Sequence, residues 1–288
     1  MLMGIIGNGY VGGAVRAFLE AKQEQVRVFD LDPARSIHSR AEVAQTDLVF
    51  LCVPTPTREG RQDLAAVWQS LIALNQLVGS QQRVVPVMIK STILPGTSRK
   101  LQAEFPHLRI VFNPEFLTAR TAVHDFAHPP AVILGFGQDP NDLILRLHRE
   151  WFPWVHTVVC QWEEAELLKY TCNTFFAVRA GFWNGIYDLC KALGVEYSTL
   201  AAGAHKLTSH IQPSYCTVPG PDGQRGFGGA CLPKDGWALL GLADTLGVDL
   251  SVLRATIEAN LRHRPETDLG LRNRSSRVVR VGDGKPPK

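Results

Sequence analysis

A glycine-rich turn near the N-terminus constrains the fold of this chain more than any other feature. Gly7, Gly9 and Gly12 form the pattern G-x-G-x-x-G. The apolar run Met1–Ile6 precedes this pattern, and the helical segment Val11–Lys22 follows it. In that context the first glycine permits a tight turn, the second lets a ligand approach the backbone, and the third lets helix and strand pack closely. The turn therefore predicts a strand, a phosphate-binding loop and a helix that open a parallel sheet.

The residue at the end of the next strand indicates which ligand this turn binds. Asp30 follows the strand-like run VRVF and lies eighteen residues after Gly12. A carboxylate there can accept both hydroxyls of an adenosine ribose and repels a 2′-phosphate. This predicts NAD as the cofactor. Two alternatives are NADP, whose phosphate Arg35 could bind, and a glycine turn that binds no ligand. The expected cofactor residues of this region are Gly7, Asn8, Gly9, Tyr10, Val11, Gly12, Asp30 and Arg35.

Strand-like and helix-like segments alternate through the first half of the chain. Alternation of this kind predicts a Rossmann-type parallel sheet with right-handed crossovers, over residues 1–160. Val67–Leu77 is a helical segment between two of the strands. The expected strands are Met1–Ile6, Val26–Asp30, Asp47–Val53, Val84–Ile89, Arg109–Phe112 and Ala131–Gly135, which closes the series.

A long helix is expected from Glu163 to Leu193, where apolar residues recur at three- and four-residue steps. At 1.5 Å per residue it would be roughly 45 Å long. It is either a core helix that joins two domains or a helix shared with a second subunit, and Gly181 and Gly185 would permit close approach. Leu193–Gly203 turns away, and two shorter helical segments follow at Trp237–Leu246 and Ser251–Leu261. The fold class is thus α/β, a Rossmann-type sheet followed by an all-α domain over residues 161–265 built on the long helix.

The net charge of +3 resides in the last 23 residues, because residues 1–265 sum to zero. We expect residues 266–288 to form a basic tail with little order, although it could also contact an acidic partner. The neutral remainder argues against a nucleic-acid-binding protein. A chain that is 45% hydrophobic and 20% charged, with no apolar run of bilayer length and no signal peptide, predicts a cytoplasmic protein without membrane contact. The six cysteines form no C-x-x-C pair and no cluster with histidines at the spacing of zinc ligands, so we expect no metal site. We also expect no disulfide framework in a chain of this length and apolar content.

Three segments carry side chains suited to chemistry. Lys169 and Asn173 are four residues apart on the long helix and so project from one face. The glycine-rich loop Gly226–Asp235 delivers Cys231 with Lys234 three residues on, and a nearby ammonium favours the thiolate. Lys90–Thr92 ends one strand, and Asn113–Leu117 follows another. A cysteine beside NAD suggests that an alcohol is oxidised to an aldehyde, captured as a thiohemiacetal, oxidised again to a thioester and hydrolysed to an acid.

These segments, taken in order, resemble the UDP-glucose/GDP-mannose dehydrogenase family. The matching motifs are GNGYVG (Gly7–Gly12), Asp30, CVPTP (Cys52–Pro56), KST (Lys90–Thr92), NPEFL (Asn113–Leu117), AELLKYTCN (Ala165–Asn173) and GFGGACLPKD (Gly226–Asp235). The resemblance implies a homodimer through the long helix and a nucleotide-sugar substrate, with Cys231 as nucleophile and Lys169 as oxyanion stabiliser. It implies that Asn173 holds sugar and water, Asp235 orients the cysteine chemistry, Thr92 holds a water near the nicotinamide and Glu115 lines the site. The resemblance also extends the set of cofactor residues by Val53, Pro54, Thr55, Thr92 and Lys234. The substrate residues that it implies are Glu115, Phe116, Leu117, Lys169, Asn173, His210, Phe227, Gly228 and Gly229.

Four features depart from what the family usually has. Ala119 occupies the position of an acid–base glutamate, and His210 occupies that of an arginine that reaches a neighbour's substrate. Gly185 stands where a glutamate is usual. Few residues follow Asn260, so we expect a short form that lacks the C-terminal UDP-binding domain.

The preferred hypothesis is a nucleotide-sugar dehydrogenase of polysaccharide biosynthesis that oxidises the C6 alcohol of a UDP-sugar, UDP-glucose first, to a uronic acid. It transfers two hydrides to NAD through Cys231. The alternatives are a two-electron NAD-dependent dehydrogenase of a sugar or hydroxyacid and a non-catalytic NAD-binding remnant. Only the first hypothesis needs Cys231 and Lys169 together.

Overall fold

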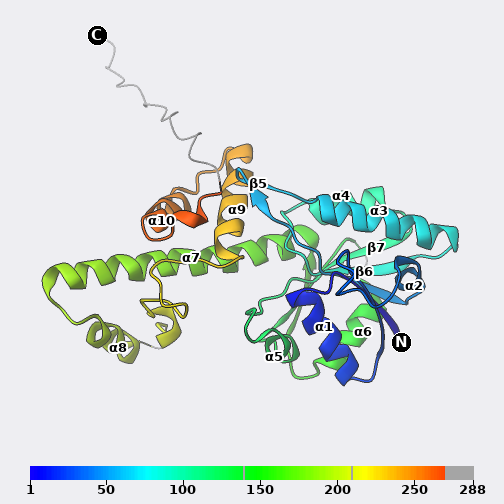
Figure 1. Cartoon of the computed structure of the whole chain (residues 1–288), viewed down its shortest axis with the longest axis horizontal. Coiled ribbons are helices and arrows are strands. Elements are labelled where there is room, and N and C mark those ends of the chain that lie inside the picture. Colours follow the sequence, from blue (N-terminus) through cyan, green and yellow to red (C-terminus); the bar gives the residue numbers. More distant parts are fainter. Residues whose placement is uncertain (139, 209, 270–288) are drawn as a thin grey trace, which may run out of the picture. The chain divides into compact units, whose positions relative to one another are not determined.

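The computed structural model describes residues 1–138, 140–208 and 210–269, which divide into two compact units (Figure 1). The first unit comprises residues 1–56 and 62–173, and the second comprises residues 57–61 together with the chain from residue 174 onward. Most of the basic tail expected at residues 266–288 lies outside the described residues.

A seven-stranded sheet forms the centre of the first unit, in the order β2-β1-β3-β6-β7-β8-β9. All neighbouring strands are parallel except β7 and β8, which are antiparallel. The α/β fold class predicted from the sequence is confirmed. The strands are β1 (Leu2–Ile6), β2 (Gln25–Phe29), β3 (Leu48–Leu51), β6 (Val85–Ile89), β7 (Leu108–Phe112), β8 (Val132–Phe136) and β9 (Thr157–Gln161).

Helices cover both faces of this sheet (Figure 1). On one face, α1 (Tyr10–Ala21), α5 (Ala122–Ala127) and α6 (Asp142–Trp151) pack around the ring of Phe18, which stacks on Phe152 with centroids 5.0 Å apart. The other face is covered by α2 (Arg40–Ala44), α3 (Ala65–Ser80), α4 (Thr97–Glu104) and the start of α7 (Trp162–Leu193). This double covering buries the apolar strands on both sides, as parallel sheets require.

Two expectations about the sheet were wrong. Ala131–Gly135 does not close the series, because β9 pairs with β8 in parallel, and the step from β7 to β8 runs antiparallel. As an edge strand, β9 leaves alternate side chains partly in solvent and lacks the continuous apolar run of the inner strands. The apolar run of a buried strand does not show the direction in which the strand runs. A strand antiparallel to its neighbour, such as β8, therefore looks in sequence like a parallel one.

The second unit is mainly helical. Residues 174–193 of α7 belong to it, with α8 (Tyr197–Leu207), α9 (Leu232–Leu246), α10 (Ser251–Leu261) and two short 3₁₀ turns, Pro213–Tyr215 and Pro265–Thr267. Its core contains Phe227, Trp237, Leu240 and Ile257. A short two-stranded sheet, β4 (Thr57–Arg58) and β5 (Arg61–Gln62), lies at the division between the units in sequence.

Three local features of this unit differ from the sequence expectation. The chain forms helix α8 where it was expected only to turn away. Helix α9 begins at Leu232, five residues before the predicted start, because Pro233 occupies the first turn, where proline is favoured. Order continues past Pro265, where Thr267 is buried and its carbonyl accepts a 2.9 Å hydrogen bond from Trp237 Nε1.

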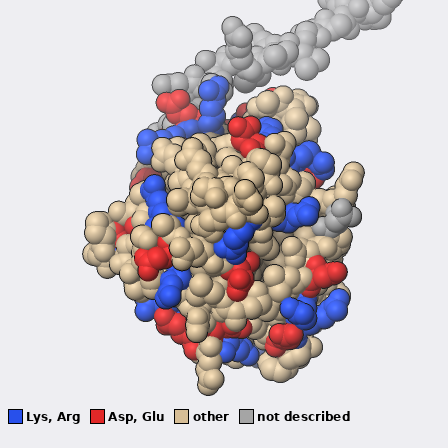
Figure 2. Space-filling view, turned by 90° about the vertical axis from the view of Figure 1, so that its right-hand side faces the viewer, with Lys and Arg blue, Asp and Glu red and all other residues tan. Residues whose placement is uncertain are grey.

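The surface carries charges of both signs. On the face shown in Figure 2, lysine and arginine side chains alternate with aspartate and glutamate side chains. None of the described helices combines the length and the hydropathy that crossing a bilayer demands.

Candidate active site

The turn between β1 and α1 forms an open backbone cradle. Gly7 has a φ of +93°, and a Cβ at Gly12 would lie 1.8 Å from the carbonyl oxygen of Gly7, so neither position accommodates a side chain. A Cβ at Gly9 would meet no atom within 4 Å. The space beside Gly9 adjoins the N-terminus of α1, where free amide groups attract phosphate. This geometry fits a dinucleotide pyrophosphate, with Tyr10 and Val11 in the first helical turn.

Asp30 is fixed beside the cradle. Its carboxylate accepts hydrogen bonds from the amides of Asn8 at 2.6 Å and Asp32 at 2.9 Å, and a carboxylate has further lone pairs for ribose hydroxyls. The Asn8 side chain donates to the carbonyl of Arg35 at 2.8 Å. The Arg35 guanidinium lies 3.3 Å from the Asp32 carboxylate. The structure thus brings Asn8, Asp30 and Arg35 together at the mouth of the turn.

The ends of β3 and β6 meet at the same edge of the sheet. The hydroxyl of Thr55 donates to the carbonyl of Thr92 at 2.7 Å, and the hydroxyl of Ser91 donates to the carbonyl of Val53 at 2.7 Å. These bonds join the Val53–Pro54–Thr55 segment to the Thr92 segment. Ligands of parallel sheets bind at such carboxyl-terminal strand ends.

Lys169 lies in a buried cluster at this edge. It is 3% exposed, and its ammonium donates to the carbonyl of Glu115 and lies 3.6 Å from that residue's carboxylate. The ammonium also lies 4.6 Å from the ring centroid of Phe116. The Glu115 carboxylate in turn accepts from the amide of Leu117 at 2.8 Å. Asn173, one helical turn after Lys169, is likewise buried. The structure therefore brings Glu115, Phe116, Leu117 and Lys169 into one cluster.

A second lysine lies buried near the first. Lys90 Nζ donates to Asn113 Oδ1 at 2.8 Å, and Asn113 Nδ2 donates to the carbonyl of Ile133. Burial lowers the pKa of Lys90 to about 8. Burial also raises the pKa of the Cys52 thiol to about 12, so Cys52 is protonated at neutral pH and is a poor nucleophile.

In the second unit, Cys231 occupies the N-cap position of α9 and is exposed. The positive end of a helix dipole stabilises a thiolate at such a position. Lys234 and Asp235 lie in the first turn, with Nζ and Oδ1 2.5 Å apart, and Asp235 is 1% exposed. The ammonium of Lys234 is thus paired with Asp235, and Cys231 lies at the helix terminus.

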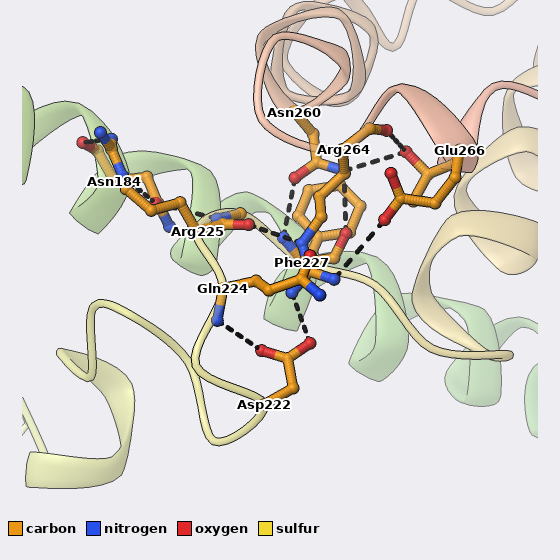
Figure 3. A network of polar contacts seen from close by, with 10 residues as sticks. Asn184, Asp222, Gln224, Arg225, Phe227, Asn260, Arg264 and Glu266 are labelled. Carbon is orange, nitrogen blue, oxygen red and sulfur yellow. Dashed lines mark hydrogen bonds and ion pairs between the residues drawn. The ribbon is translucent and has the colours of Figure 1, made fainter.

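The loop before Cys231 is held by a polar network (Figure 3). Asn260 accepts from the amide of Phe227 at 2.7 Å and donates to its carbonyl at 2.9 Å. Arg264 donates to the carbonyl of Arg225 at 2.6 Å and pairs with Asp222 at 2.5 Å. These bonds fasten the loop to α10 and the residues just after it.

This network changes the interpretation of the glycines. A Cβ at Gly226 would lie 2.3 Å from Asn260 Oδ1, and one at Gly228 would lie 2.7 Å from Arg264 Nη1. Both glycines therefore let the loop pack tightly on its support. Phe227 is buried in the core with both backbone groups bonded to Asn260, whereas a Cβ at Gly229, whose φ is +74°, would meet nothing within 4 Å. His210 is exposed, after α8.

Sequence reasoning placed Lys90 and Asn113 in segments suited to chemistry but gave neither a role, and it missed the supporting residues Asn260 and Arg264. Lys90 and Asn113 each follow an inner strand, and that position was the available signal. Asn260 lies near the end of α10 and Arg264 lies just after it. Polar residues at such a position look in sequence like those of any solvated helix end, so the sequence did not predict their burial.

Two domain models of the UDP-glucose/GDP-mannose dehydrogenase family match the chain. The family's NAD binding domain matches residues 35–152, and its central domain matches residues 163–262.

The relatives of this chain are named after two different substrates. UDP-glucose 6-dehydrogenase of Rickettsia conorii is 31% identical over 229 residues, which cover 78% of this chain and 51% of the relative. GDP-mannose 6-dehydrogenase of Pseudomonas aeruginosa is 31% identical over 240 residues, which cover 76% of this chain and 51% of the relative. This chain thus spans about half the length of these relatives. A solved UDP-glucose dehydrogenase of Pyrobaculum islandicum superposes with a TM-score of 0.80 at 26% identity, covering 91% of this chain and 68% of that one.

Proposed function

Because the chain belongs to the UDP-glucose/GDP-mannose dehydrogenase family, we propose that it oxidises the C6 alcohol of a nucleotide sugar to a carboxylate. NAD, the cofactor predicted from the glycine turn, is confirmed by the match to the family's NAD binding domain. The observation that carries the proposal is Cys231, an exposed cysteine at the N-terminus of α9. Oxidation of an alcohol to an aldehyde has no use for such a nucleophile, whereas in oxidation through to an acid it holds the aldehyde as a thiohemiacetal.

The proposed reaction assigns each side chain one task. NAD, when bound, accepts a hydride from the sugar in each of two oxidations. After the first oxidation, the Cys231 thiolate adds to the aldehyde carbon and gives a thiohemiacetal, whose oxygen Lys169 stabilises as charge develops. The second oxidation leaves a thioester, water adds to its carbonyl, and the thiolate departs from the acid. One alcohol, one water and two oxidised cofactors thus give one carboxylate, two reduced cofactors and three protons.

The remaining polar groups hold substrate and water. We assign Asn173 to the sugar and a water, Thr92 to a water near the nicotinamide, Glu115 to the wall of the site and Asp235 to orientation of the cysteine chemistry. The amides of Gly228 and Gly229 are assigned to the diphosphate, since Phe227 has its own amide bonded to Asn260. The names of the relatives support UDP-glucose or GDP-mannose as substrate, and we propose UDP-glucose.

The test counts reduced cofactor per sugar. Purified protein is given limiting UDP-glucose, GDP-mannose or UDP-N-acetyl sugars with excess NAD, and absorbance at completion gives the stoichiometry. We expect two NADH per sugar and loss of the acid product in Cys231→Ser, with Cys160→Ser as the control. One NADH per sugar that is unchanged in Cys231→Ser would establish a two-electron dehydrogenase instead. No reduction with any substrate, despite measurable NAD binding, would support the non-catalytic alternative.

Ala119 predicts which step is slow. The family's usual glutamate at this position would assist hydrolysis, so we expect the thioester on Cys231 to accumulate during turnover. Intact-protein mass spectrometry of quenched reactions checks this, because the acyl group adds to the chain the mass of the substrate less the four hydrogens that the two oxidations remove. Absence of the adduct while turnover is slow would show that another group replaces the glutamate or that another step limits the rate.

We further propose a homodimer formed through α7. Phe175, Phe182 and Leu189 recur at seven-residue spacing on this helix and are 58%, 60% and 54% exposed. A helix that leaves such a stripe uncovered is suited to packing against a second copy. Gly181 does not serve that packing, because a Cβ there would lie 2.8 Å from Thr256 Cγ2 of α10 in the same chain.

A further inference from the structure

A cavity of about 180 Å³ lies within the first unit, away from the glycine turn. Its walls come from the sheet, from α5 and α6, and from the segment that follows β7. Most of the lining is aromatic or apolar, with Phe50, Phe126, Trp151 and Phe152 among its residues. Engineered cavities of about 150 Å³ with apolar walls bind benzene, so this volume suffices for a single aromatic ring.

Buried polar groups lie in the same lining. Lys90, Asn113 and His148 are 4%, 4% and 3% exposed. Lys90 Nζ donates to Asn113 Oδ1 and lies 5.1 Å from the ring centroid of Phe126, which itself lines the cavity. An ammonium with three donors can therefore bind an acceptor inside the cavity while it keeps its bond to Asn113.

Lys90 brings a buried positive charge to the cavity, and its ammonium bonds to the neutral side chain of Asn113. Burial lowers the pKa of His148 to about 4, so this imidazole is neutral at pH 7, and its Nδ1 lies 2.9 Å from the carbonyl of Ile144. Two carboxylates also line the cavity, and each has partners of its own. Glu115 lies 3.6 Å from the ammonium of Lys169, and Asp125 lies 3.6 Å from Nδ1 of His124 and accepts from Thr118 and Thr121. The Lys90 ammonium lies in an apolar surrounding, where an opposite charge at contact distance is worth far more than in water.

We propose that this cavity binds a small aromatic carboxylate, with the ring among Phe126, Trp151 and Phe152 and the carboxylate on the ammonium of Lys90. The ring packs against the aromatic walls, and the carboxylate supplies the lysine with a charge-assisted bond. The cavity shares Glu115, Phe116 and Leu117 with the proposed sugar site, but none of the residues of the glycine turn or of α9 lines it.

The test uses benzoate as the probe and benzyl alcohol as the neutral control. Binding is measured by saturation-transfer NMR and calorimetry on the full chain, without NAD or sugar. We expect saturable benzoate binding that weakens roughly ten- to a hundredfold in Lys90→Met, since a hydrogen bond to a charged group contributes about 1.5–3 kcal/mol. Benzyl alcohol is expected to bind wild type and Lys90→Met equally. Val132→Phe, which fills the cavity from β8, is expected to abolish binding of both probes.

Three outcomes would overturn the site. These are no benzoate binding to wild type, equal benzoate affinity in Lys90→Met, or undiminished binding in a folded Val132→Phe. If a variant does not fold, a crystal structure of the wild-type protein with 4-bromobenzoate decides the matter through the anomalous signal of bromine. Bromine in the cavity with the carboxylate within 3.5 Å or so of Lys90 Nζ supports the proposal, and bromine elsewhere contradicts it.

Discussion

Lys169 is the residue whose surroundings most clearly suit catalysis. It is 3% exposed, and its ammonium contacts both the carbonyl and the carboxylate of Glu115. A buried cation held in this way is already oriented before charge develops on a substrate oxygen, and such preorganised groups commonly contribute the largest part of a rate enhancement.

We expect Lys169→Met to lower kcat by about 10²–10³-fold, the range found when one preorganised donor is removed. Steady-state kinetics with NAD and UDP-glucose measures this. Lys100→Met, at an exposed lysine of α4, is the matched control and is expected to keep wild-type kcat. A kcat within about twofold of wild type in Lys169→Met would remove this lysine from the proposed mechanism.

His148 gives the fold a pH dependence on the acid side. Burial lowers its pKa from 6.5 to about 4, so between these values the unfolded chain binds a proton that the folded chain does not. The stability that depends on neutral His148 is therefore fully present above pH 6.5 and is lost as the pH falls through about 4.

Replacement by phenylalanine removes this titration and keeps the aromatic packing on Trp151 and Phe152. Urea unfolding at several pH values measures the free energy of unfolding. Between pH 6.5 and 4 we expect this free energy to fall less steeply in His148→Phe than in wild type, by up to about 1.4 kcal/mol per pH unit. His156→Gln, at an exposed histidine, serves as the control and is expected to follow wild type. If the unfolding free energies of wild type and His148→Phe change with pH in parallel, His148 does not have a lowered pKa in the folded chain.

At the scale of elements, α7 and α4 are joined by one buried carboxylate. Glu166 is fully buried and accepts hydrogen bonds from the amides of Gly96 at 2.6 Å and Ser98 at 2.7 Å, at the start of α4. Burial nevertheless raises its pKa from 4.5 to about 7, because desolvation outweighs these bonds. The proton bound by the folded chain contributes stability that is fully present below pH 4.5 and is lost as the pH rises through about 7.

Glu166→Gln has no such titration. The unfolding free energy of wild type relative to this variant is therefore expected to decline as the pH rises from 4.5 to 7 and to level off above that range. Denaturant unfolding across this range measures the difference, with Glu104→Gln on the exposed side of α4 as the control. A difference that is constant with pH would show that Glu166 remains ionised in the folded chain throughout.

The loop before Cys231 depends on α10 in a comparable way. Asn260→Leu would leave the amide and carbonyl of buried Phe227 without these partners, at a cost of roughly 1–3 kcal/mol for each unsatisfied group. We expect faster hydrogen exchange at the Phe227 amide and a higher KM for nucleotide sugar. Gln224→Ala, at an exposed side chain of the same loop, is expected to change neither. Unchanged exchange at Phe227 in Asn260→Leu would show that the loop does not depend on this side chain.

How far the sequence predicts these elements depends on whether a segment carries its own signal. Inner strands such as β1 and β3 are continuous apolar runs, and the glycine turn prescribes its own geometry, so both were predicted. Edge strand β9 has no fully buried side chain and was missed. Lys90 meets Asn113 because β6 and β7 are neighbours, and Asn260 meets Phe227 across 33 residues, so these pairings follow from tertiary structure. The motif located Cys231, but only the structure showed that α9 begins at the next residue.

At the scale of the whole molecule, we propose that the exposed stripe on α7 forms the interface between two copies of the chain. A stripe of Phe175, Phe182 and Leu189 loses contact with water when two copies pack along it, and burial of one phenylalanine side chain contributes about 1.5–3 kcal/mol. Introducing a charge at the centre of the stripe reverses this gain, because the carboxylate would be desolvated without a partner.

Phe182→Glu is therefore expected to convert a dimer to a monomer at micromolar concentration, which corresponds to a dissociation constant raised at least about a hundredfold. Light scattering coupled to size-exclusion chromatography measures the mass. Val252→Glu is the matched control, because Val252 is 68% exposed on α10 and lies outside the stripe, and this variant is expected to remain dimeric. A monomeric wild type, or a Phe182→Glu variant that keeps the dimer mass, would show that α7 does not form the interface.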